Sequence, residues 1–230
     1  MTILCIETST NACSAAICID GQAAAVKANL AGANHASQLP VFVEELMQQA
    51  HTHGWKLDAV AFSQGPGSYT GLRIGTSIAK GLCYGLNMPL IPINTLQILC
   101  ATLQQLAPTS ALLCPMLDAR RMEVYTAFFR ADNLQAESQV EAKIIDENAF
   151  ADILSERQVA FFGDGAAKCQ PLLCSPNALF IPDILPQAAY MGQLAEQLYP
   201  SALTTKQMAY YEPFYLKEFI PAPSHIKGLK

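Results

Sequence analysis

Residues 65–75 read GPGSYTGLRIG, and they join an apolar, β-rich run at residues 57–63 to a predicted helix at residues 74–86. Glycines let a backbone approach a ligand closely, and free N–H groups at the start of a helix attract anions. The segment lacks the Gly-Lys-Ser/Thr of a Walker loop, and Thr70 stands where the dinucleotide-binding pattern needs its third glycine. Its shape alone leaves two interpretations open, a phosphate-binding loop and a purely structural turn.

A second loop connects two predicted strands near the N-terminus. It reads ETSTNACS at residues 7–14, between strands predicted at residues 2–7 and 14–19. A carboxylate at a strand end, followed by small hydroxyl residues in a tight hairpin, resembles the first phosphate loop of actin-like ATPases and sugar kinases. In those folds the acid handles metal or water, and the backbone N–H groups of the turn meet phosphate. The alternative interpretation is a hydroxyl-rich β-turn without a ligand.

The order of predicted elements repeats along the chain, without a convincing repeat of the sequence itself. In the first half, patterning and turn signals predict strands at residues 2–7, 14–19, 23–29 and 57–63, and helices at 36–51, 74–86 and 96–106, with a short apolar stretch at 90–93 between the last two helices. In the second half they predict strands at residues 112–117, 124–130, 139–145 and 159–162, and helices at 148–156 and 187–198.

This repeated order predicts an α/β fold with two lobes, each a mixed sheet flanked by helices. We expect the N-terminal lobe, which would bind a partner, to span residues 1–105. The C-terminal lobe would span residues 106–230, with the last helix packing back toward the first lobe.

The composition excludes a disordered or fibrous chain. Of the 230 residues, 51% are hydrophobic and 14% are charged, against a typical charged share of about 25%. Residues 1–115 carry four basic and five acidic side chains, and residues 81–117 carry none. Because so few charges cannot solvate an ordinary surface, we expect the first half to bury part of its outer surface against a partner.

Charge and hydropathy exclude further classes of protein. A net charge of −5 without a Lys/Arg cluster argues against an independent nucleic-acid binder. Prolines interrupt the charge-free stretch before it reaches the length of a membrane span, and no signal peptide is visible, so we expect a cytoplasmic protein. The eight cysteines form no C-x-x-C pair, so we expect mostly buried free thiols and no zinc site.

Five segments, in this order, resemble the bacterial TsaB (YeaZ) family. They are residues 3–14, HASQLP at 35–40, GPGSYTGLRIG at 65–75, LDARRMEVY at 117–125 and EPFYL at 212–216. The resemblance covers nearly the whole chain and implies a two-lobed actin-like fold of the ASKHA class. It also implies a role in forming threonylcarbamoyladenosine next to the anticodon of tRNAs. Members of this family are non-catalytic subunits that bind the related catalytic protein TsaD, and the ATPase TsaE joins the assembly.

The histidines agree with a non-catalytic role. The resemblance implies that the catalytic relative holds its metal with a pair of histidines on the helix after the third strand. This chain has only His35 there, and Leu39 occupies the helical i+4 position, so we expect neither a metal site nor catalytic residues. The first-loop acid is Glu7, where many relatives have Asp. We expect His51 and His53, at the far end of the helix, to be exposed to solvent.

Two sets of candidate site residues follow. The two loops predict a nucleotide-binding site, vestigial or at the partner interface, formed by Glu7, Thr8, Ser9, Gly65, Gly67 and Ser68. No cofactor is expected unless ATP or ADP binds at that interface. The apolar faces of two helices predict a partner interface formed by Leu39, Val41, Phe42, Val43, Leu46, Ile78 and Leu82. These side chains could instead be ordinary core, because amphipathic stripes usually face inward.

The resemblance implies that a TsaD-like catalytic subunit and a TsaE-like ATPase are the partners. The same helices could also pair two copies of this chain, and tRNA would be reached only through the complex, with no membrane contact. The charged hairpin at residues 118–123 has two interpretations. It is either an ion-paired turn that closes the cleft between the lobes or a docking point for a partner or nucleotide.

Two other functions stay open. An ATP-dependent phosphotransferase or ATPase of the actin-like class would use Glu7 and the glycine-rich loop to cradle phosphates. A metallopeptidase follows an old label for the catalytic relatives, and the missing second histidine argues against it.

Overall fold

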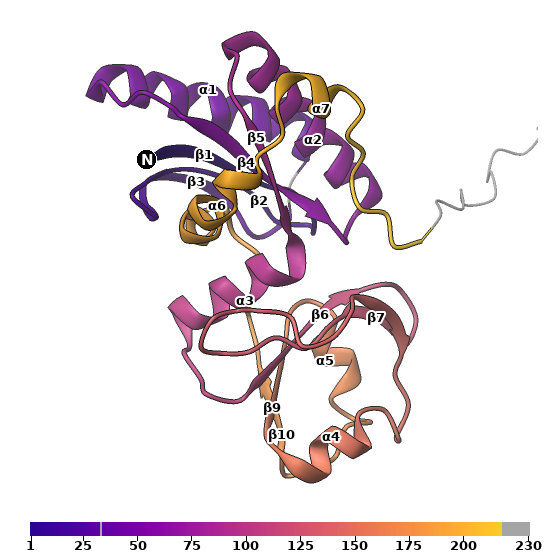
Figure 1. Cartoon of the computed structure of the whole chain (residues 1–230). Coiled ribbons are helices and arrows are strands. Elements are labelled where there is room, and N and C mark those ends of the chain that lie inside the picture. The colour runs from indigo at the N-terminus through magenta and orange to yellow at the C-terminus, as the bar shows by residue number, and fades with distance from the viewer. Residues whose placement is uncertain (33, 218–230) are drawn as a thin grey trace, which may run out of the picture.

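Two five-stranded sheets form the two lobes of the protein (Figure 1). The computed structural model describes residues 1–32 and 34–217. The first sheet consists of β1 (Thr2–Glu7), β2 (Cys13–Ile19), β3 (Gln22–Asn29), β4 (Ala59–Gly65) and β5 (Leu90–Asn94). The second consists of β6 (Leu112–Asp118), β7 (Glu123–Thr126), β8 (Glu141–Ile144), β9 (Val159–Phe162) and β10 (Ala178–Ile181).

The two sheets have the same topology. The first has the order β3-β2-β1-β4-β5, and the second, taken in the matching direction, has the order β8-β7-β6-β9-β10. In each sheet the first three strands of the chain pair antiparallel, and the last two are added in parallel. The predicted class, a two-lobed actin-like (ASKHA) α/β fold with a mixed sheet in each lobe, is confirmed.

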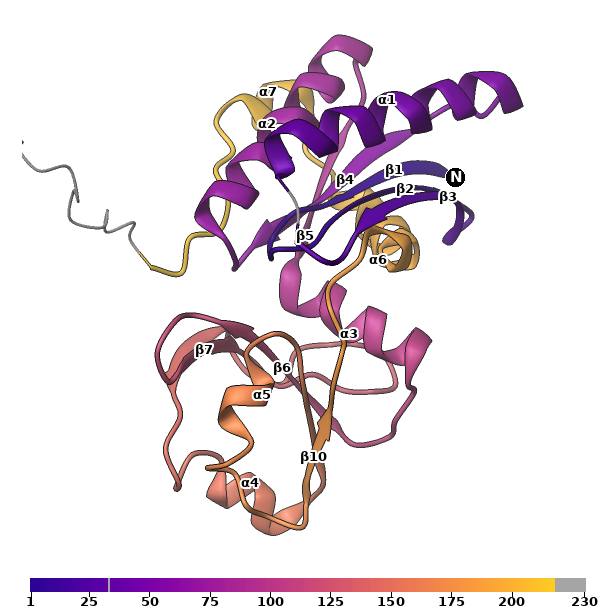
Figure 2. The same cartoon turned by 180° about the vertical axis from the view of Figure 1, so that it is seen from behind.

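Helices cover both faces of the first sheet (Figures 1 and 2). One face carries α1 (His35–His53) and α2 (Tyr69–Leu86), and the other carries α3 (Thr95–Leu106), the 3-10 turn η1 (Ala188–Tyr190) and α6 (Gly192–Leu198). Alternate residues of β1 therefore enter different cores: Leu4 and Ile6 pack toward α1 and α2, while Ile3 and Cys5 pack toward α3 and α6. Because both faces are covered, the strand is apolar throughout its centre rather than alternating.

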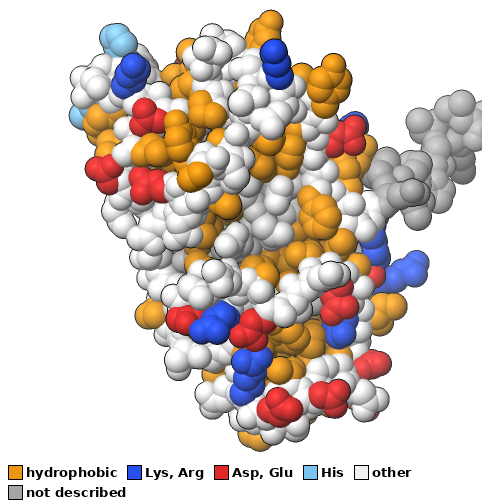
Figure 3. All heavy atoms as spheres, in the orientation of Figure 1, with side chains coloured by type: hydrophobic (Ala, Val, Ile, Leu, Met, Phe, Trp, Pro, Cys, Tyr) orange, Lys and Arg blue, Asp and Glu red, His pale blue; other side chains and the backbone are white. Residues whose placement is uncertain are grey.

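The helix α3 lies between the two sheets. Its residues Ile98 and Ala101 pack against the first lobe, and Leu99 and Leu103 pack against the second. A helix with apolar side chains on two faces is stable only when both faces are covered. Much of the charge-free stretch at residues 81–117 is therefore buried inside the chain itself. Figure 3 shows that few charged side chains lie across the centre of the first lobe on the face in view.

Short helices complete the second lobe and the C-terminal part of the chain. The outer face of the second sheet carries α4 (Ala151–Glu156) and α5 (Ala166–Cys169). After α6, the turn η2 (Tyr199–Ser201) leads to Leu203, which pairs with Leu90 of β5, and α7 (Thr205–Ala209) follows. Residues 210–217, here called the strap, then run beside α2 toward the second lobe (Figures 1 and 2).

Several elements differ from their predicted bounds. The helix α2 begins at Tyr69 rather than at residue 74, because the side chain of Ser68 caps it by accepting a hydrogen bond from the Gly71 amide at 3.2 Å. The strand predicted at residues 124–130 ends as β7 at Thr126. The elements α5, β10 and α7 were not predicted, since segments of four or five residues hold too little of a period to be recognised.

All eight cysteines are free thiols. Seven of them are buried and Cys174 is exposed, which confirms the expectation of mostly buried thiols. Among the residues that the structure describes, no helix is both long and apolar enough to cross a membrane.

Candidate functional site

The first loop and the glycine-rich segment meet at the end of β1. The Ser68 amide donates a hydrogen bond to the carbonyl oxygen of Ser9 at 2.7 Å. The Thr8 hydroxyl donates to the carbonyl oxygen of Gly71 at 2.8 Å. These bonds join segments about 60 positions apart in the sequence, so the structure brings the six predicted nucleotide-site residues together.

The glycines of this segment are needed for contact between the two loops. A Cβ atom at Gly67 would overlap the carbonyl oxygen of Ser9, and a Cβ atom at Gly71 would overlap the carbonyl oxygen of Thr8. Gly67 also has a φ of +156°, which side chains rarely adopt. The close approach for which these glycines are required is thus made to the chain's own backbone.

The amide groups of the first loop are also bonded within the protein. The Thr8 amide donates to the Ser63 hydroxyl at 3.3 Å, and the Ser9 amide donates to Glu7 Oε1 at 2.6 Å. Glu7, Thr8 and Ser9 are all buried, whereas Ser68 is exposed. These two donors, which could meet a phosphate in an open loop, are therefore engaged with side chains of the same lobe.

Glu7 is the buried acid at the centre of this arrangement. Burial raises the pKa of its carboxyl group from 4.5 to about 7, although hydrogen bonds from Ser9, Ser63 and Thr8 favour the charged form. Its Oε1 atom accepts from Ser9, and its Oε2 atom has no hydrogen-bond partner among the described residues. Within the described ranges, no three His, Cys, Asp or Glu side chains gather as a metal-binding group.

The histidines lie apart from this acid. His35 Nε2 lies 3.1 Å from the carbonyl oxygen of Ala12, at the start of α1. His51 and His53 are exposed, as predicted, and the His53 ring stacks on Trp55 with 4.6 Å between ring centroids.

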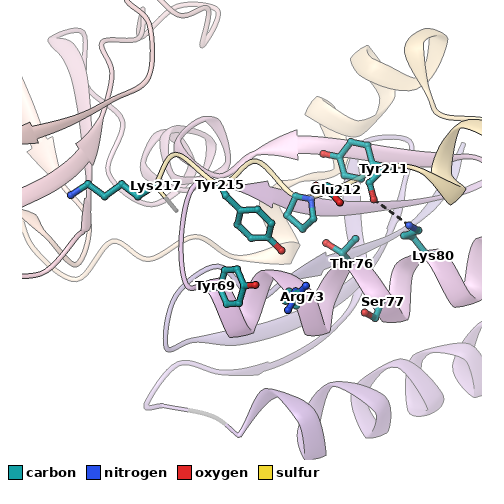
Figure 4. A pocket seen from close by; sticks show the side chains of 10 residues that line it. Tyr69, Arg73, Thr76, Ser77, Lys80, Tyr211, Glu212, Tyr215 and Lys217 are labelled. Carbon is teal, nitrogen blue, oxygen red and sulfur yellow. Dashed lines mark hydrogen bonds between the residues drawn. The ribbon is translucent and has the colours of Figure 1, made fainter. Parts of the chain in front are cut away.

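A groove of about 490 Å³ lies between α2 and the strap (Figure 4). Its α2 side is formed by Tyr69, Arg73, Thr76, Ser77 and Lys80, and its strap side by Tyr211, Glu212, Pro213, Tyr215 and Lys217. None of the motifs in the sequence predicted this groove. The polar residues of α2 recur at positions i, i+3, i+4 and i+7 from residue 73, and this spacing could have revealed one polar helix face.

Contacts across the groove hold the strap on α2. Lys80 Nζ donates to the carbonyl oxygens of Ala209 at 3.1 Å and Tyr211 at 3.2 Å. The Arg73 guanidinium lies 4.8 Å from the centroid of the Tyr69 ring, and the Tyr69 and Tyr215 rings are 4.9 Å apart. Lys80 of α2 therefore holds main-chain carbonyl groups of the C-terminal segment, and Arg73 of α2 lies over an aromatic ring.

Beneath the strap, two further bonds reach β4. The Phe214 amide donates to the carbonyl oxygen of Gln64 at 2.7 Å, and the Tyr211 hydroxyl donates to Gln64 Oε1 at 2.8 Å. The hydroxyl of Thr76, in the floor of the groove, is buried and has no partner among the described residues.

The predicted partner interface needs a correction at three positions. Leu39, Val43 and Leu46 are buried in the core of the first lobe, because the stripe that they form on α1 faces its own sheet. Phe42, Ile78 and Leu82 are half-buried against the same core. Of the predicted set, only Val41 is exposed, at 48%.

Two exposed apolar residues near the end of α2 were missed by the sequence analysis. Tyr84 is 77% exposed and Leu86 is 49% exposed. In the sequence they follow Lys80, the last charged residue of α2. The absence of charge after Lys80 could have indicated an exposed apolar surface.

The charged hairpin at residues 118–123 connects β6 to β7. Lys168 pairs with Asp118, and Lys217 of the strap pairs with Glu123. Lys168 Nζ also donates to the carbonyl oxygen of Glu123 at 2.7 Å. Both acids of the hairpin are thus paired with lysines from other segments, and one of these pairs joins the two lobes.

Comparison with known proteins gives consistent results. Residues 22–217 match the family model described as TsaD, tRNA N6-adenosine threonylcarbamoyltransferase. The chain is 30% identical to the tRNA threonylcarbamoyladenosine biosynthesis protein TsaB of Escherichia coli (strain K12), over 94% of this chain and 95% of that protein. It is 28% identical to the protein of the same name from Haemophilus influenzae, over 94% of each. The solved structure of YeaZ from Pseudomonas aeruginosa is similar, with a TM-score of 0.78 and 25% identity over 94% of this chain and 99% of that chain.

Proposed function

The chain belongs to the TsaB (YeaZ) family of tRNA threonylcarbamoyladenosine biosynthesis proteins, and from this premise we propose that it is a non-catalytic subunit that activates a TsaD-like threonylcarbamoyltransferase by binding it. The family predicted from the sequence motifs is confirmed. In this proposal a TsaE-like ATPase joins the assembly, and tRNA is modified by the catalytic partner. Such a role would place the protein in the cytoplasm.

The packing of the two loops is the observation that carries the proposal. An actin-like enzyme needs its phosphate loops open to nucleotide. Here the Ser68 amide is bonded to Ser9, and the Thr8 and Ser9 amides are bonded inside the lobe. The glycines allow the two loops to pack in direct contact. The loops then serve the stability of the first lobe, which supports a binding role over catalysis.

The outer surface of α1 and α2 is the docking surface that we propose for the TsaD-like partner. The two helices form the outermost layer of the first lobe (Figures 1 and 2). Val41, Tyr84 and Leu86 are exposed on them, above the half-buried Phe42 and Leu82. An exposed aromatic residue with apolar neighbours and few charges is typical of the centre of a protein interface. In the absence of the partner, the same surface would pair two copies of the chain.

Co-purification with the partner tests this proposal. We expect Val41→Glu and Tyr84→Glu to abolish capture of the TsaD-like subunit and the formation of threonylcarbamoyladenosine by the mixture, with unchanged thermal melting. Ile144→Glu is the matched control, because Ile144 is a 72% exposed apolar residue of the second lobe. Folded variants that capture the partner as well as the parent would exclude this surface, and a parent chain without any effect on the partner's activity would exclude the proposed function.

One observation favours a second candidate function, an ATP-dependent phosphotransferase or ATPase. Among the described residues Glu7 Oε2 has no hydrogen-bond partner, and burial raises the pKa of the Glu7 carboxyl group to about 7, as expected for a general acid or base. This function requires the loops to separate. Steady ATP turnover by the isolated protein that is lost in Glu7→Gln would establish it, and the absence of turnover would exclude it.

A further inference from the structure

Two adjacent arginines form the tip of the β6–β7 hairpin. Arg120 and Arg121 are exposed, and in the part of the chain that the structure describes neither guanidinium has an ion-pair or hydrogen-bond partner. The nearby acids are already engaged: Asp118 accepts from Lys168 and from the Arg120 amide, and Glu123 pairs with Lys217. The two positive charges therefore remain available at the surface.

The other cations of the second lobe behave differently. Arg130 pairs with Asp132 at 2.7 Å, and Arg157 pairs with Glu137 at 2.7 Å. Lys143 pairs with Glu141 at 3.3 Å. In a chain with 19 acidic and 14 basic residues, a carboxylate is the usual neighbour of a surface cation. Arg120 and Arg121 are exceptions, because neither guanidinium has a carboxylate partner among the described residues.

The backbone at this tip is held in an unfavourable conformation. Arg120 has a φ of +69° and Arg121 a φ of +50°, in the left-handed region that Asn and Gly adopt more readily than Arg. The turn is fixed by the Arg120 amide, which donates to Asp118 Oδ1 at 2.8 Å, and by the Glu123 amide, which donates to the Arg120 carbonyl oxygen at 3.2 Å. Strain of this kind costs stability, and it persists because the surrounding bonds hold the backbone in place.

The tip lies at the mouth between the lobes, beside the end of the strap. Lys217 reaches Glu123 there, and the same lysine lines the groove to which Arg73 contributes. The hairpin therefore lies next to the strap end of this groove.

We propose that Arg120 and Arg121 bind phosphate groups of the tRNA backbone when this chain is part of the modifying complex. The inference rests on the proposed function, which brings tRNA to the complex, and it goes beyond it by giving this subunit a direct contact. Arginine is suited to this contact because its planar fork of donors matches the oxygens of a phosphate. Such contacts position a nucleic acid and do not depend on its sequence. With a net charge of −5, the isolated chain would bind tRNA weakly, so the contact acts within the assembly.

The decisive variant is Arg120→Asn/Arg121→Gly. It removes both charges and introduces the residues that the turn conformation prefers, so its melting temperature should equal or exceed that of the parent. Binding of an unmodified tRNA transcript to the assembled complex is measured as a function of salt concentration. We expect weaker binding, and a slope of log K against log[salt] reduced by about 0.7–0.9 for each arginine lost. Arg130→Gln/Arg157→Gln is the matched control, with two arginines of the same lobe removed, and it should leave the slope unchanged.

The other outcomes separate this inference from the proposed function. If the Asn-Gly variant is folded and the complex keeps the parental affinity and salt slope, the arginines do not contact tRNA. If the variant loses affinity for the protein partner while the tRNA slope per assembled complex is unchanged, the hairpin is a protein-docking element and the inference is wrong. If the parent chain does not assemble with a TsaD-like subunit, the proposed function is wrong, whatever the arginine variants show. Lysine at both positions should restore most of the salt slope, since it keeps the charge.

Discussion

The Ser68 amide donates a hydrogen bond to the Ser9 carbonyl oxygen at 2.7 Å, and this bond joins the two loops that resemble phosphate-binding elements. A Ser68 amide that is bonded in this way is not available to an anion. The bond therefore links the start of α2 to the end of β1, and it makes the glycine-rich segment part of the packing of the lobe. Its consequences can be measured through the glycines and through the buried acid.

Gly71→Ala should destabilise the protein by about 1–3 kcal/mol, because the added Cβ would overlap the carbonyl oxygen of Thr8. Gly81→Ala, in the same helix, is the control: a Cβ atom there would meet nothing within 4 Å. That control should stabilise the protein by about 0.5–1 kcal/mol. Urea unfolding of both variants gives the comparison, and equal stabilities would show that the loops tolerate separation.

Glu7→Gln should change how stability depends on pH. Because burial raises the pKa of Glu7 from 4.5 to about 7, the folded state holds this proton more tightly than the unfolded state does. The charged form therefore lowers the stability of the parent progressively as pH rises from about 4.5 to 7. The variant, which is always neutral, should gain about 2–3 kcal/mol over the parent between pH 5 and pH 8. Unfolding curves at the two pH values would contradict this if the difference between variant and parent stayed constant.

Lys80→Met should loosen the strap without unfolding the lobe. The substitution removes the two hydrogen bonds from Nζ to the carbonyl oxygens of Ala209 and Tyr211 but keeps an apolar side chain of similar length. The Phe214 amide, which is bonded to Gln64, should then exchange its hydrogen faster. Lys56→Met, an exposed lysine before β4, is the control and should leave exchange at Phe214 unchanged. Parental exchange at Phe214 in the Lys80 variant would mean that other contacts hold the strap.

Leu46→Ala and Val41→Ala should separate the two faces of α1. Leu46 is fully buried, so its truncation should cost about 2–5 kcal/mol of stability. Val41 is 48% exposed, so its truncation should stay within about 0.5 kcal/mol of the parent. Thermal melting checks both. A stable Leu46 variant with impaired partner binding would show that Leu46 is part of the partner interface.

The sequence predicted the doubled order of strands and helices because each lobe repeats the same hydrophobic periods and turn signals. The two loops were also predicted to form one site, because both resemble segments of a known family. The conformation of those loops could not be predicted, since the contacts of Gly67 and Gly71 are made with residues about 60 positions earlier. A glycine that admits a ligand and a glycine that admits another loop look the same in a sequence.

The partner interface was ambiguous for a different reason. Leu39, Val43 and Leu46 form a stripe of helical period, and the period shows that one face is covered without showing what covers it. The strap was missed because its role depends on main-chain carbonyls that Lys80 reaches across 129 and 131 positions of the chain. Contacts of this range are set by the tertiary fold alone.

The position of α3 between the two sheets limits how the lobes can move. Because Ile98 packs on one sheet and Leu99 on the other, a wide opening of the cleft would strip apolar surface from one side of this helix. Small sliding motions about α3 keep both contacts, whereas hinge-like separation exposes one of them. Loss of one lobe likewise removes part of the core of the other, so the two lobes should melt in a single cooperative transition by calorimetry. A shared helix of this kind makes the protein a stiff body, whose surfaces a partner meets at fixed angles.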